Sequence, residues 1–350
     1  MRILFTYFGK TVGTRILSVL LAFAALLVLM DLIDNFEDIL EKRGSLTDVA
    51  RFVAYRVPTI IERLIPIAVL IGSTMGILTL ATRSELIVLR AAGISPLKIA
   101  GLGLPACLIV VAGHFFLADY VAPTSQKAFI EWWEPLLNED APQWLRGEED
   151  IVRISGVSND GKMLTGLSFF QRDGIGRLTG RQTAASARFE DGGWLLYETS
   201  DAVVEKGNLQ IIEAEVIPWP NGPDPQVILD LIAPPEQLTN STLGKVLNVA
   251  WSSSADPSVY GTELARRSVG PLTSLVMMLI AASTIRGQSR SGGPQMGAAI
   301  AIALGLSFLV FDGIFASLGK AGVLTPLFAA WVPLVIFVII SGIFLSRSES

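Results

Sequence analysis

Three long apolar stretches open the chain and three more close it, and a long polar segment separates the two sets. A helix needs roughly 20 consecutive apolar residues to cross the hydrocarbon core of a membrane. The pattern therefore predicts six membrane-spanning helices, three on each side of an extramembrane domain. Their apolar cores are expected at Ile16 to Met30, Val57 to Ala81, Leu97 to Val121, Val269 to Ile285, Gly297 to Leu318 and Pro326 to Leu345.

The polar segment changes character at about residue 148, where short runs begin to alternate apolar and polar side chains. This period of two is typical of antiparallel strands, and turn residues separate the runs. A helix is expected before the strands, over Thr124 to Leu137, and an irregular return path after them, marked by Pro218 to Pro225 and Pro234-Pro235. The expected strands are Met163 to Gln171, Arg177 to Ala184 and Trp194 to Glu198, and the turns are Asn159-Asp160-Gly161, Arg172-Asp173-Gly174 and Asp191-Gly192-Gly193.

The predicted fold is therefore a membrane α-helical protein with an inserted all-β domain, a small sandwich or jelly roll, between the third and fourth helices. The N-terminal membrane half covers residues 1–121 and the C-terminal half residues 263–350. Residues 122–262 form the extramembrane segment, with the β-domain at about 148–235.

Composition supports a membrane protein and removes several functional classes. The chain is 51% hydrophobic and only 17% charged, and its mean hydropathy is +0.53. A net charge of -5 provides no basic field for nucleic acid. The single cysteine, Cys107, allows neither a disulfide framework nor a thiolate metal site.

Motifs for catalysis are missing from the sequence. It contains no metalloprotease helix, no Gly-x-Ser-x-Gly elbow and no Walker phosphate loop. The one histidine, His114, lies in an apolar run and is expected to be a helix-packing residue. We therefore expect a protein that is not an enzyme, binds no metal or cofactor, and depends on another subunit for energy.

The short loops predict an orientation, because Lys and Arg concentrate on the cytoplasmic side of membrane proteins. Nine basic residues lie on the side of the termini: Arg2, Lys10, Arg15, Arg83, Arg90, Lys98, Arg286, Arg290 and Arg347. Five lie in the short loops of the other side: Lys42, Arg43, Arg51, Arg56 and Lys320. Both termini are thus expected in the cytoplasm and the middle segment outside it, although Arg266 and Arg267 fall on the disfavoured side.

The loop between the second and third spans is predicted to hold a short helix over residues 82–93. Thr82 and Glu85 have the spacing of a capping box, and Gly93 is a natural terminator. Ser95-Pro96 then begins a new helix. The polar residues of the loop helix suit docking into a partner's groove, but they are also compatible with a loop helix capped only for its own stability.

Polar residues within the spans carry two interpretations. Glu62, Arg63 and Asp312 could line a cavity, or they could be interfacial pairs and caps. Gly72 and Gly76 form a small-xxx-small face that predicts close helix packing.

Five segments together resemble one family, the lipopolysaccharide-export permeases of Gram-negative bacteria, which are the F and G subunits of an ABC transporter. They are Tyr7 to Thr11, Asp31 to Asp34, the loop Arg83 to Ser95, Asp191 to Trp194, and the proline-led fourth span from Pro271. The loop is the most specific of them, and the resemblance covers nearly the whole chain. The opening motif and the Arg-Ser-Glu-Leu form of the loop are more similar to the G subunit than to the F subunit.

The resemblance implies six membrane helices with a periplasmic β-jelly-roll, and a partnership with an F-type sister permease over two cytoplasmic ATPase subunits. ATP would be used by those subunits alone. The family also works with a bitopic periplasmic protein and a soluble periplasmic bridge. It implies that the loop helix is a coupling helix seated on the ATPase, with Glu85 facing that subunit and Arg83, Ser84 and Arg90 beside it.

Candidate lipid contacts follow from the same resemblance. The family commonly places basic residues at the outer end of the first span, whereas this chain has Asp31 and Asp34 there. Lys42 and Arg43 are the nearest cations for an anionic headgroup, and a solvated loop is the competing interpretation. The two aspartates could instead bridge divalent cations to the headgroup. Groove-lining candidates in the β-domain are Leu164, Leu167 and Phe169.

Three alternatives stand beside the transporter hypothesis. A permease for another lipid-linked cargo, such as lipoprotein release, would keep the ATPase coupling, but such systems typically have four spans. A membrane-anchored scaffold would use the β-domain only to bind partners, and it should tolerate replacement of Glu85. A membrane enzyme ranks last, for lack of a convergent nucleophile and base.

Overall fold

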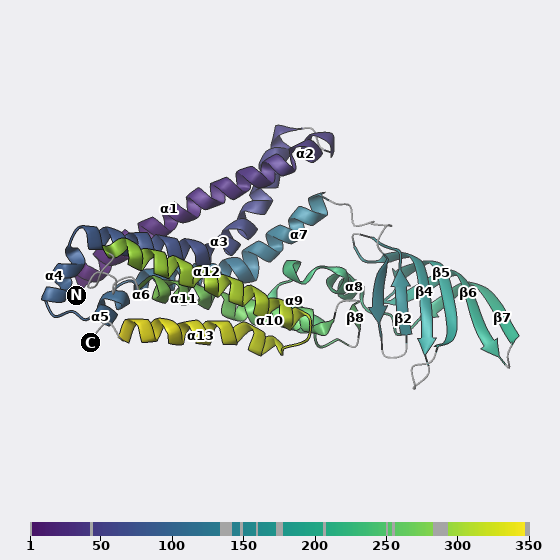
Figure 1. Ribbon diagram of the computed structural model, residues 1–350. Coiled ribbons are helices and arrows are strands. Elements are labelled where there is room, and N and C mark those ends of the chain that lie inside the picture. Colours follow the sequence, from purple (N-terminus) through teal and green to yellow (C-terminus); the bar gives the residue numbers. More distant parts are fainter. Residues whose placement is uncertain are drawn as a thin grey trace. The chain divides into compact units, whose positions relative to one another are not determined.

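The structure, a computed structural model, describes residues 2–42, 45–133, 142–147, 150–158, 160–172, 178–205, 208–249, 251–253, 256–282 and 293–346. It divides into two compact units (Figure 1). Residues 1–126 and 262–350 form a helical unit, and residues 127–261 form a second unit, the β-unit, which contains a sheet.

Six helical segments in the described part of the chain are long and apolar enough to cross a membrane, so the six expected spans are confirmed. The spans are α1 (Arg2–Asp34); α3 (Leu46–Thr82); α6 (Leu104–Phe116) with η1 (Leu117–Val121) and α7 (Ala122–Trp133); α10 (Pro257–Val269) with η3 (Gly270–Leu272) and α11 (Thr273–Ala282); α12 (Gly293–Lys320); and α13 (Pro326–Ser346). Shorter helices connect them: α2 (Phe36–Lys42), α4 (Glu85–Ala91) and α5 (Pro96–Gly101). The helix α1 begins, and α13 ends, at the end of the helical unit that carries α4 and α5 (Figure 1).

The third span begins at Leu104, and the expectation that it begins at Leu97 is wrong. Helix α5 ends at Gly101, and Leu102 and Gly103 separate it from α6. A proline at the second position of α6 fits this break, because proline is accommodated in the first turn of a helix.

Two glycines allow α1 and α3 to pack closely. A Cβ atom at Gly72 would lie 2.5 Å from the Cα atom of Ile16, and one at Gly76 would lie 3.1 Å from a methyl group of Val12. The prediction of a small-residue packing face is therefore confirmed. Small residues at such a face let the two backbones approach and gain dispersion contacts that larger side chains would prevent.

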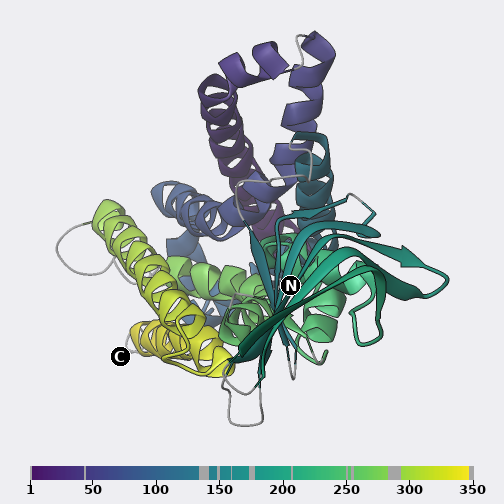
Figure 2. The same ribbon diagram turned by 90° about the vertical axis from the view of Figure 1, so that its right-hand side faces the viewer.

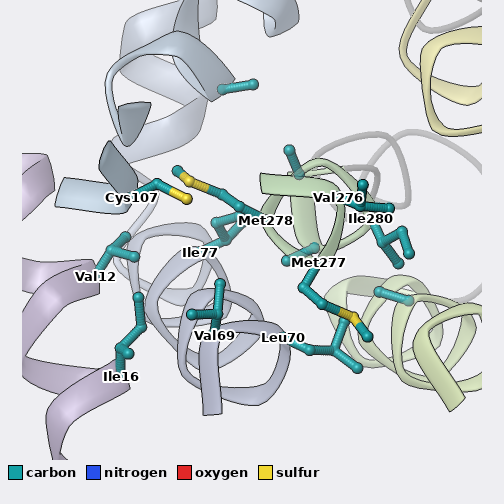
Figure 3. Close-up of a cluster of buried hydrophobic side chains, with 14 of the residues drawn as sticks. Val12, Ile16, Val69, Leu70, Ile77, Cys107, Val276, Met277, Met278 and Ile280 are labelled. Atoms are coloured by element: carbon teal, nitrogen blue, oxygen red, sulfur yellow. The ribbon is translucent and has the colours of Figure 1, made fainter. Parts of the chain in front are cut away.

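The core of the helical unit forms where α1, α3 and α11 meet (Figure 3). Val12 from α1, Val69 from α3 and Met277 from α11 are almost completely buried there. By contrast, α1, α6, α12 and α13 expose large apolar side chains on their outer faces, such as Leu21, Ile109, Val310 and Ile339. In a membrane these faces contact lipid tails, which is why they can stay apolar without protein cover.

The β-unit confirms the predicted all-β insertion between the third and fourth spans. Its described strands are β1 (Gln143–Arg146), β2 (Asp150–Ile154), β3 (Gly156–Val157), β4 (Met163–Arg172), β5 (Leu178–Glu190), β6 (Gly193–Glu205), β7 (Asn208–Trp219) and β8 (Ser252–Ser253). In the part of the unit that the structure describes, they form one eight-stranded antiparallel sheet in the order β7-β6-β5-β4-β2-β1-β8, with β3 paired to β4. The sheet is strongly twisted (Figure 2).

The hairpin between β5 and β6 shows why its turn could be predicted. Glu190 pairs with Gly193, so Asp191 and Gly192 form a two-residue loop. Their φ angles are 48° and 83°, as a type I′ turn requires. Asp tolerates this left-handed conformation and Gly adopts it freely, so the predicted turn is confirmed.

A second predicted turn precedes β4. The hydroxyl group of Ser158 donates to Asp160 Oδ1 at 2.6 Å, and the backbone N–H of Lys162 donates to the same oxygen at 3.0 Å. These bonds favour the ionised carboxylate and hold the pKa of Asp160 below its ordinary value. Gly161, with a φ of 69°, completes the turn. Asn159 of this turn, Asp173 and Gly174 of the third predicted turn, and residues 134–137 of the expected helix lie outside the described residues.

The return path is more regular than expected. It contains α8 (Pro225–Ile232), the turn η2 (Pro235–Gln237) and α9 (Asn240–Val246). Helix α8 forms because Pro225 begins it, and Ile228 and Leu231 give it a buried face. The prolines of this segment were predicted to mark an irregular path, whereas the apolar spacing of Ile228 and Leu231 was the available signal for α8.

Candidate functional site

The connection between α3 and α4 contains a sharp left-handed turn. Helix α3 continues to Thr82, whose hydroxyl group donates to the carbonyl oxygen of Thr79 at 3.0 Å. Ser84 follows with a φ of 60° and ψ of 8°, and α4 begins at Glu85. The predicted capping box is therefore wrong, because Thr82 still belongs to α3 and its hydroxyl group bonds within that helix.

The other end of α4 agrees with the prediction. Gly93 has a φ of 78°, its N–H donates to the carbonyl oxygen of Arg90 at 2.9 Å, and the N–H of Ile94 donates to that of Leu89 at 3.1 Å. This pair of bonds is a Schellman motif, which satisfies the last carbonyls of a helix. Ser95 then caps α5 by accepting from the N–H of Lys98. The predicted end of the loop helix and start of the next helix are confirmed.

The carboxylate of Glu85 accepts a hydrogen bond from the hydroxyl group of Tyr7 on α1, at 3.0 Å to Oε1. Beside this bond is an apolar pocket of about 270 Å³. Its lining residues are Leu4, Tyr7, Phe8, Leu80, Arg83, Glu85, Val88, Leu89 and Leu102.

Helix α4 has one anchored side and one free apolar side. Leu86 is completely buried against the spans, whereas Ile87 is 58% exposed and Val88 66% exposed. An exposed pair of aliphatic side chains on a short helix that ends in a Schellman motif gives a partner an apolar surface to cover. The arrangement can therefore present the helix rigidly at the end of the bundle.

The four residues predicted for coupling thus lie on α4 and on the turn that precedes it. Arg83 and Glu85 line the pocket, Ser84 is exposed on the turn between them, and Arg90 is half-buried near the end of α4. Tyr7 was named in the sequence analysis only as part of the opening family motif and was not predicted to belong to this site. Tyr7 is 78 residues from Glu85, and the sequence does not determine the rotation of α1, so nothing in it indicated that the two residues are in contact.

The residues predicted for the headgroup are only partly brought together. Asp31 accepts two hydrogen bonds from Arg56, from Nε to Oδ2 at 2.6 Å and from Nη2 to Oδ1 at 2.9 Å. This bidentate pair links α1 to α3 and engages both carboxylate oxygens. Asp34 is exposed. Arg43 lies outside the described residues, as does the side chain of Lys42.

A divalent cation would need several oxygen ligands close together. Within the described residues, no group of three or more His, Cys, Asp or Glu side chains is arranged to hold a metal ion. Asp31 is instead occupied by its guanidinium partner. The charge at this end of α1 therefore serves first to hold two spans together.

A second set of charges joins the fourth and fifth spans. Arg266 on α10 donates to both carboxylate oxygens of Asp312 on α12, at 3.2 and 2.7 Å. Glu263 accepts from Arg267 at 3.2 Å and lies 3.6 Å from Lys320 Nζ. The sequence analysis named the basic residues and Asp312 separately and did not name Glu263; the opposite charges in adjacent spans were the available signal for pairing them.

His114 lies inside the helical unit, where it is 3% exposed. Its Nδ1 is 3.3 Å from the hydroxyl group of Ser274, and its Nε2 is 3.9 Å from Glu62. These contacts connect α6 with α11 and α3, in agreement with a packing role. Glu62 faces His114, whereas its neighbour Arg63 is exposed.

The three predicted groove residues of the β-domain are buried on β4. Leu164, Leu167 and Phe169 are exposed by 0%, 1% and 3%. Gly166, with a φ of 61°, lies on the strand between Leu164 and Leu167, and Ser168 is buried as well. Phe169 packs edge-on against Trp219, with ring centroids 5.1 Å apart. In this conformation the three side chains form part of the core of the β-unit.

Comparison with known proteins covers nearly the whole chain. The model of a family described as "Lipopolysaccharide export system permease LptF/LptG" matches residues 6–347. The chain is 26% identical to the lipopolysaccharide export system permease protein LptG of Escherichia coli K12, over 98% of both chains. It is 22% identical to the LptG protein of Haemophilus influenzae, again over 98% of both chains.

Proposed function

Because the chain belongs to the LptF/LptG family of lipopolysaccharide export system permeases, we propose that it is the G-type permease subunit of an ABC transporter. In this proposal it extracts lipopolysaccharide from the inner membrane and passes it towards the outer membrane. The observation that carries the proposal is the family match across residues 6–347, which includes all six spans and the inserted sheet.

The chemistry of the cargo explains why such a fold is suitable. Each acyl methylene group exposed to water costs about 0.8 kcal/mol, so exposing all the chains of a lipopolysaccharide would cost tens of kcal/mol. A lateral gate between two permeases would admit the lipid without wetting its chains. The β-domain would then receive the chains in an apolar groove, for which Leu164, Leu167 and Phe169 are candidates. Because these side chains are buried, the residues that cover this face of the sheet, such as Trp219 on Phe169, would have to move aside before a chain could bind.

Energy would come from a dimeric cytoplasmic ATPase, with ATP bound only by that partner. We assign α4 as the coupling helix and Glu85 as its contact carboxylate, supported by Arg83, Ser84 and Arg90. The exposed Ile87 and Val88 favour this assignment, since they give the helix an apolar surface to dock. The Schellman motif at the C-terminal end of α4 favours it too, because a helix with a fixed end transmits a displacement better than a loop.

The remaining partners would be an F-type sister permease, a bitopic periplasmic protein and a soluble periplasmic bridge. Both termini would face the cytoplasm and the β-unit the periplasm, as the distribution of Lys and Arg favours. Lys42, Arg43 and the exposed Asp34 stay candidates for the headgroup region. Asp31 is better suited to bracing α1 against α3 through Arg56.

The test is reconstitution of the complete complex in vesicles that contain lipopolysaccharide. We expect release of lipopolysaccharide to a soluble acceptor only when ATP and both permeases are present. A complex that hydrolyses ATP and moves a different lipid, while leaving lipopolysaccharide in place, would contradict the proposed cargo. A chain that assembles with its partners but shows no ATP-dependent movement of lipid would favour a scaffold.

A further inference from the structure

Glu85 and Tyr7 bring two distant parts of the chain together at one hydrogen bond. Tyr7 lies in α1, the first span, and Glu85 begins α4, 78 residues later. The phenol hydroxyl group donates to Oε1 of the carboxylate at 3.0 Å. This bond is the direct polar link between the first span and the carboxylate assigned to coupling.

Both partners of the bond have a buried neighbour in the sequence. Phe8, next to Tyr7, is 3% exposed, and Leu86, next to Glu85, is completely buried. These anchors fix the backbone on each side, so the bond length is set by the packing of the helical unit. Both residues also line the pocket of about 270 Å³, together with the buried core residues Phe8 and Leu80.

The chemistry of the pair leaves Glu85 able to meet a cationic partner. An ionised carboxylate has two oxygens and about four acceptor positions. Among the residues that the structure describes, Tyr7 donates to Oε1 of Glu85 and adds no charge, so Oε2 can accept from a guanidinium or ammonium group. A donor that holds the carboxylate in one rotamer also reduces the entropy lost when the partner binds.

We propose that Tyr7 is a positioning residue for Glu85 and fastens the first span to the coupling helix. A displacement of α4 would then pull on α1 through this bond. The inference rests on the proposed coupling role of α4 and deepens it, since it names the span that receives the displacement.

The experiment uses the complex of this chain with its sister permease and ATPase, reconstituted with lipopolysaccharide. The measured quantity is the coupling ratio, the amount of lipopolysaccharide released per ATP hydrolysed, for the parental chain, Tyr7→Phe, Glu85→Ala and the double variant. Tyr120→Phe is the matched control, because it removes a phenol hydroxyl group from a side chain that is 60% exposed on the third span.

We expect Tyr7→Phe to lower the coupling ratio about two- to tenfold, as loss of one hydrogen bond allows. The same amount of ATPase should copurify, and Tyr120→Phe should match the parental chain. Glu85→Ala should lower the ratio at least as much. The coupling ratio of the double variant should equal that of Glu85→Ala, because Tyr7 cannot position a carboxylate that has been removed.

Other outcomes separate the two proposals. If Glu85→Ala uncouples the complex while Tyr7→Phe behaves like the parental chain, Tyr7 is not a positioning residue and the coupling role of α4 stands. A double variant that shows the product of both losses, or a Tyr7→Phe complex that loses its ATPase, overturns the inference as well. If Glu85→Ala leaves the ratio unchanged, the proposed coupling role itself fails.

Discussion

Single residues decide how closely the spans of this protein approach one another. Gly72 faces the backbone of Ile16, where a Cβ atom would lie 2.5 Å from Cα, and backbone atoms cannot move aside as a flexible side chain can. Gly13, on α1, has open space where its own Cβ atom would be. The two glycines therefore predict opposite responses to the same substitution.

We expect Gly72→Ala to destabilise the protein by about 1–3 kcal/mol, the usual cost of overpacking a close contact. Gly13→Ala is the matched control and should be neutral or stabilising by up to about 1 kcal/mol, since alanine is the better helix former. Thermal unfolding in detergent, followed by tryptophan fluorescence, measures both. Equal unfolding temperatures for the two variants would contradict the close approach of α1 and α3.

A second prediction concerns the ion pair between the fourth and fifth spans. The side chains of Arg266 and Asp312 are 29% and 17% exposed, so the pair is partly shielded from water. Asp312→Leu should destabilise the protein by about 1–3 kcal/mol, because it leaves a partly buried guanidinium group without its carboxylate. Exchange of the two residues, Arg266→Asp with Asp312→Arg, should recover part of the loss.

Thermal unfolding of the single variants Arg266→Asp and Asp312→Arg and of the exchanged variant measures the coupling between the two positions. Asp38→Leu, on the exposed face of α2, is the control for loss of one carboxylate. If the exchanged variant is less stable than either single variant, the ion pair does not bring α10 and α12 together.

At the scale of an element, the stability of α4 depends on the glycine that ends it. Gly93 has a φ of 78° and open space around the position of a Cβ atom. Gly93→Ala should therefore cost only the left-handed conformation, about 1–2 kcal/mol, with no steric clash. Gly93→Asn should cost less, because asparagine tolerates this conformation.

Hydrogen exchange of the amide groups in residues 89–94 measures this effect, since the Schellman bonds of Gly93 and Ile94 protect them. We expect faster exchange in Gly93→Ala than in Gly93→Asn. Gly244→Ala is the control, because Gly244 lies inside α9 with open space around it. Unchanged exchange in Gly93→Ala would show that the end of α4 does not rely on this motif.

Sequence patterns predicted the elements better than the contacts between them. The spans, the Asp191-Gly192 turn and the terminator Gly93 follow from local rules, and each is present. The prediction of a capping box was wrong because α3 continues through Thr82. The spacing of nearby residues does not determine where the preceding helix ends. The bonds from Tyr7 to Glu85 and from Arg56 to Asp31 depend on helix rotation and packing, for which one sequence contains no direct signal.

At the scale of the whole molecule, the chain divides into a unit that contains the six candidate membrane spans and a unit that contains the sheet. The β-unit, residues 127–261, has its own core, in which Trp194 is 2% exposed and donates from Nε1 to the carbonyl oxygen of Pro223 at 2.7 Å. Trp219 packs near it, with ring centroids 5.9 Å apart. A domain with its own core can fold without the helices that flank it.

We therefore expect residues 127–261, expressed alone, to be soluble and rich in β-structure. Burial of Trp194 and Trp219 should shift the tryptophan fluorescence of the fragment to shorter wavelength, and the shift should be lost cooperatively in urea. Trp194→Ala should lower the free energy of unfolding by about 3–5 kcal/mol, because it removes a large buried side chain and its hydrogen bond. Trp144→Ala, at a side chain that is 38% exposed, is the matched control and should cost less.

A fragment that is disordered in water would mean that the sheet needs the membrane spans to fold. The apolar groove proposed for the lipid chains would then have to form together with those spans.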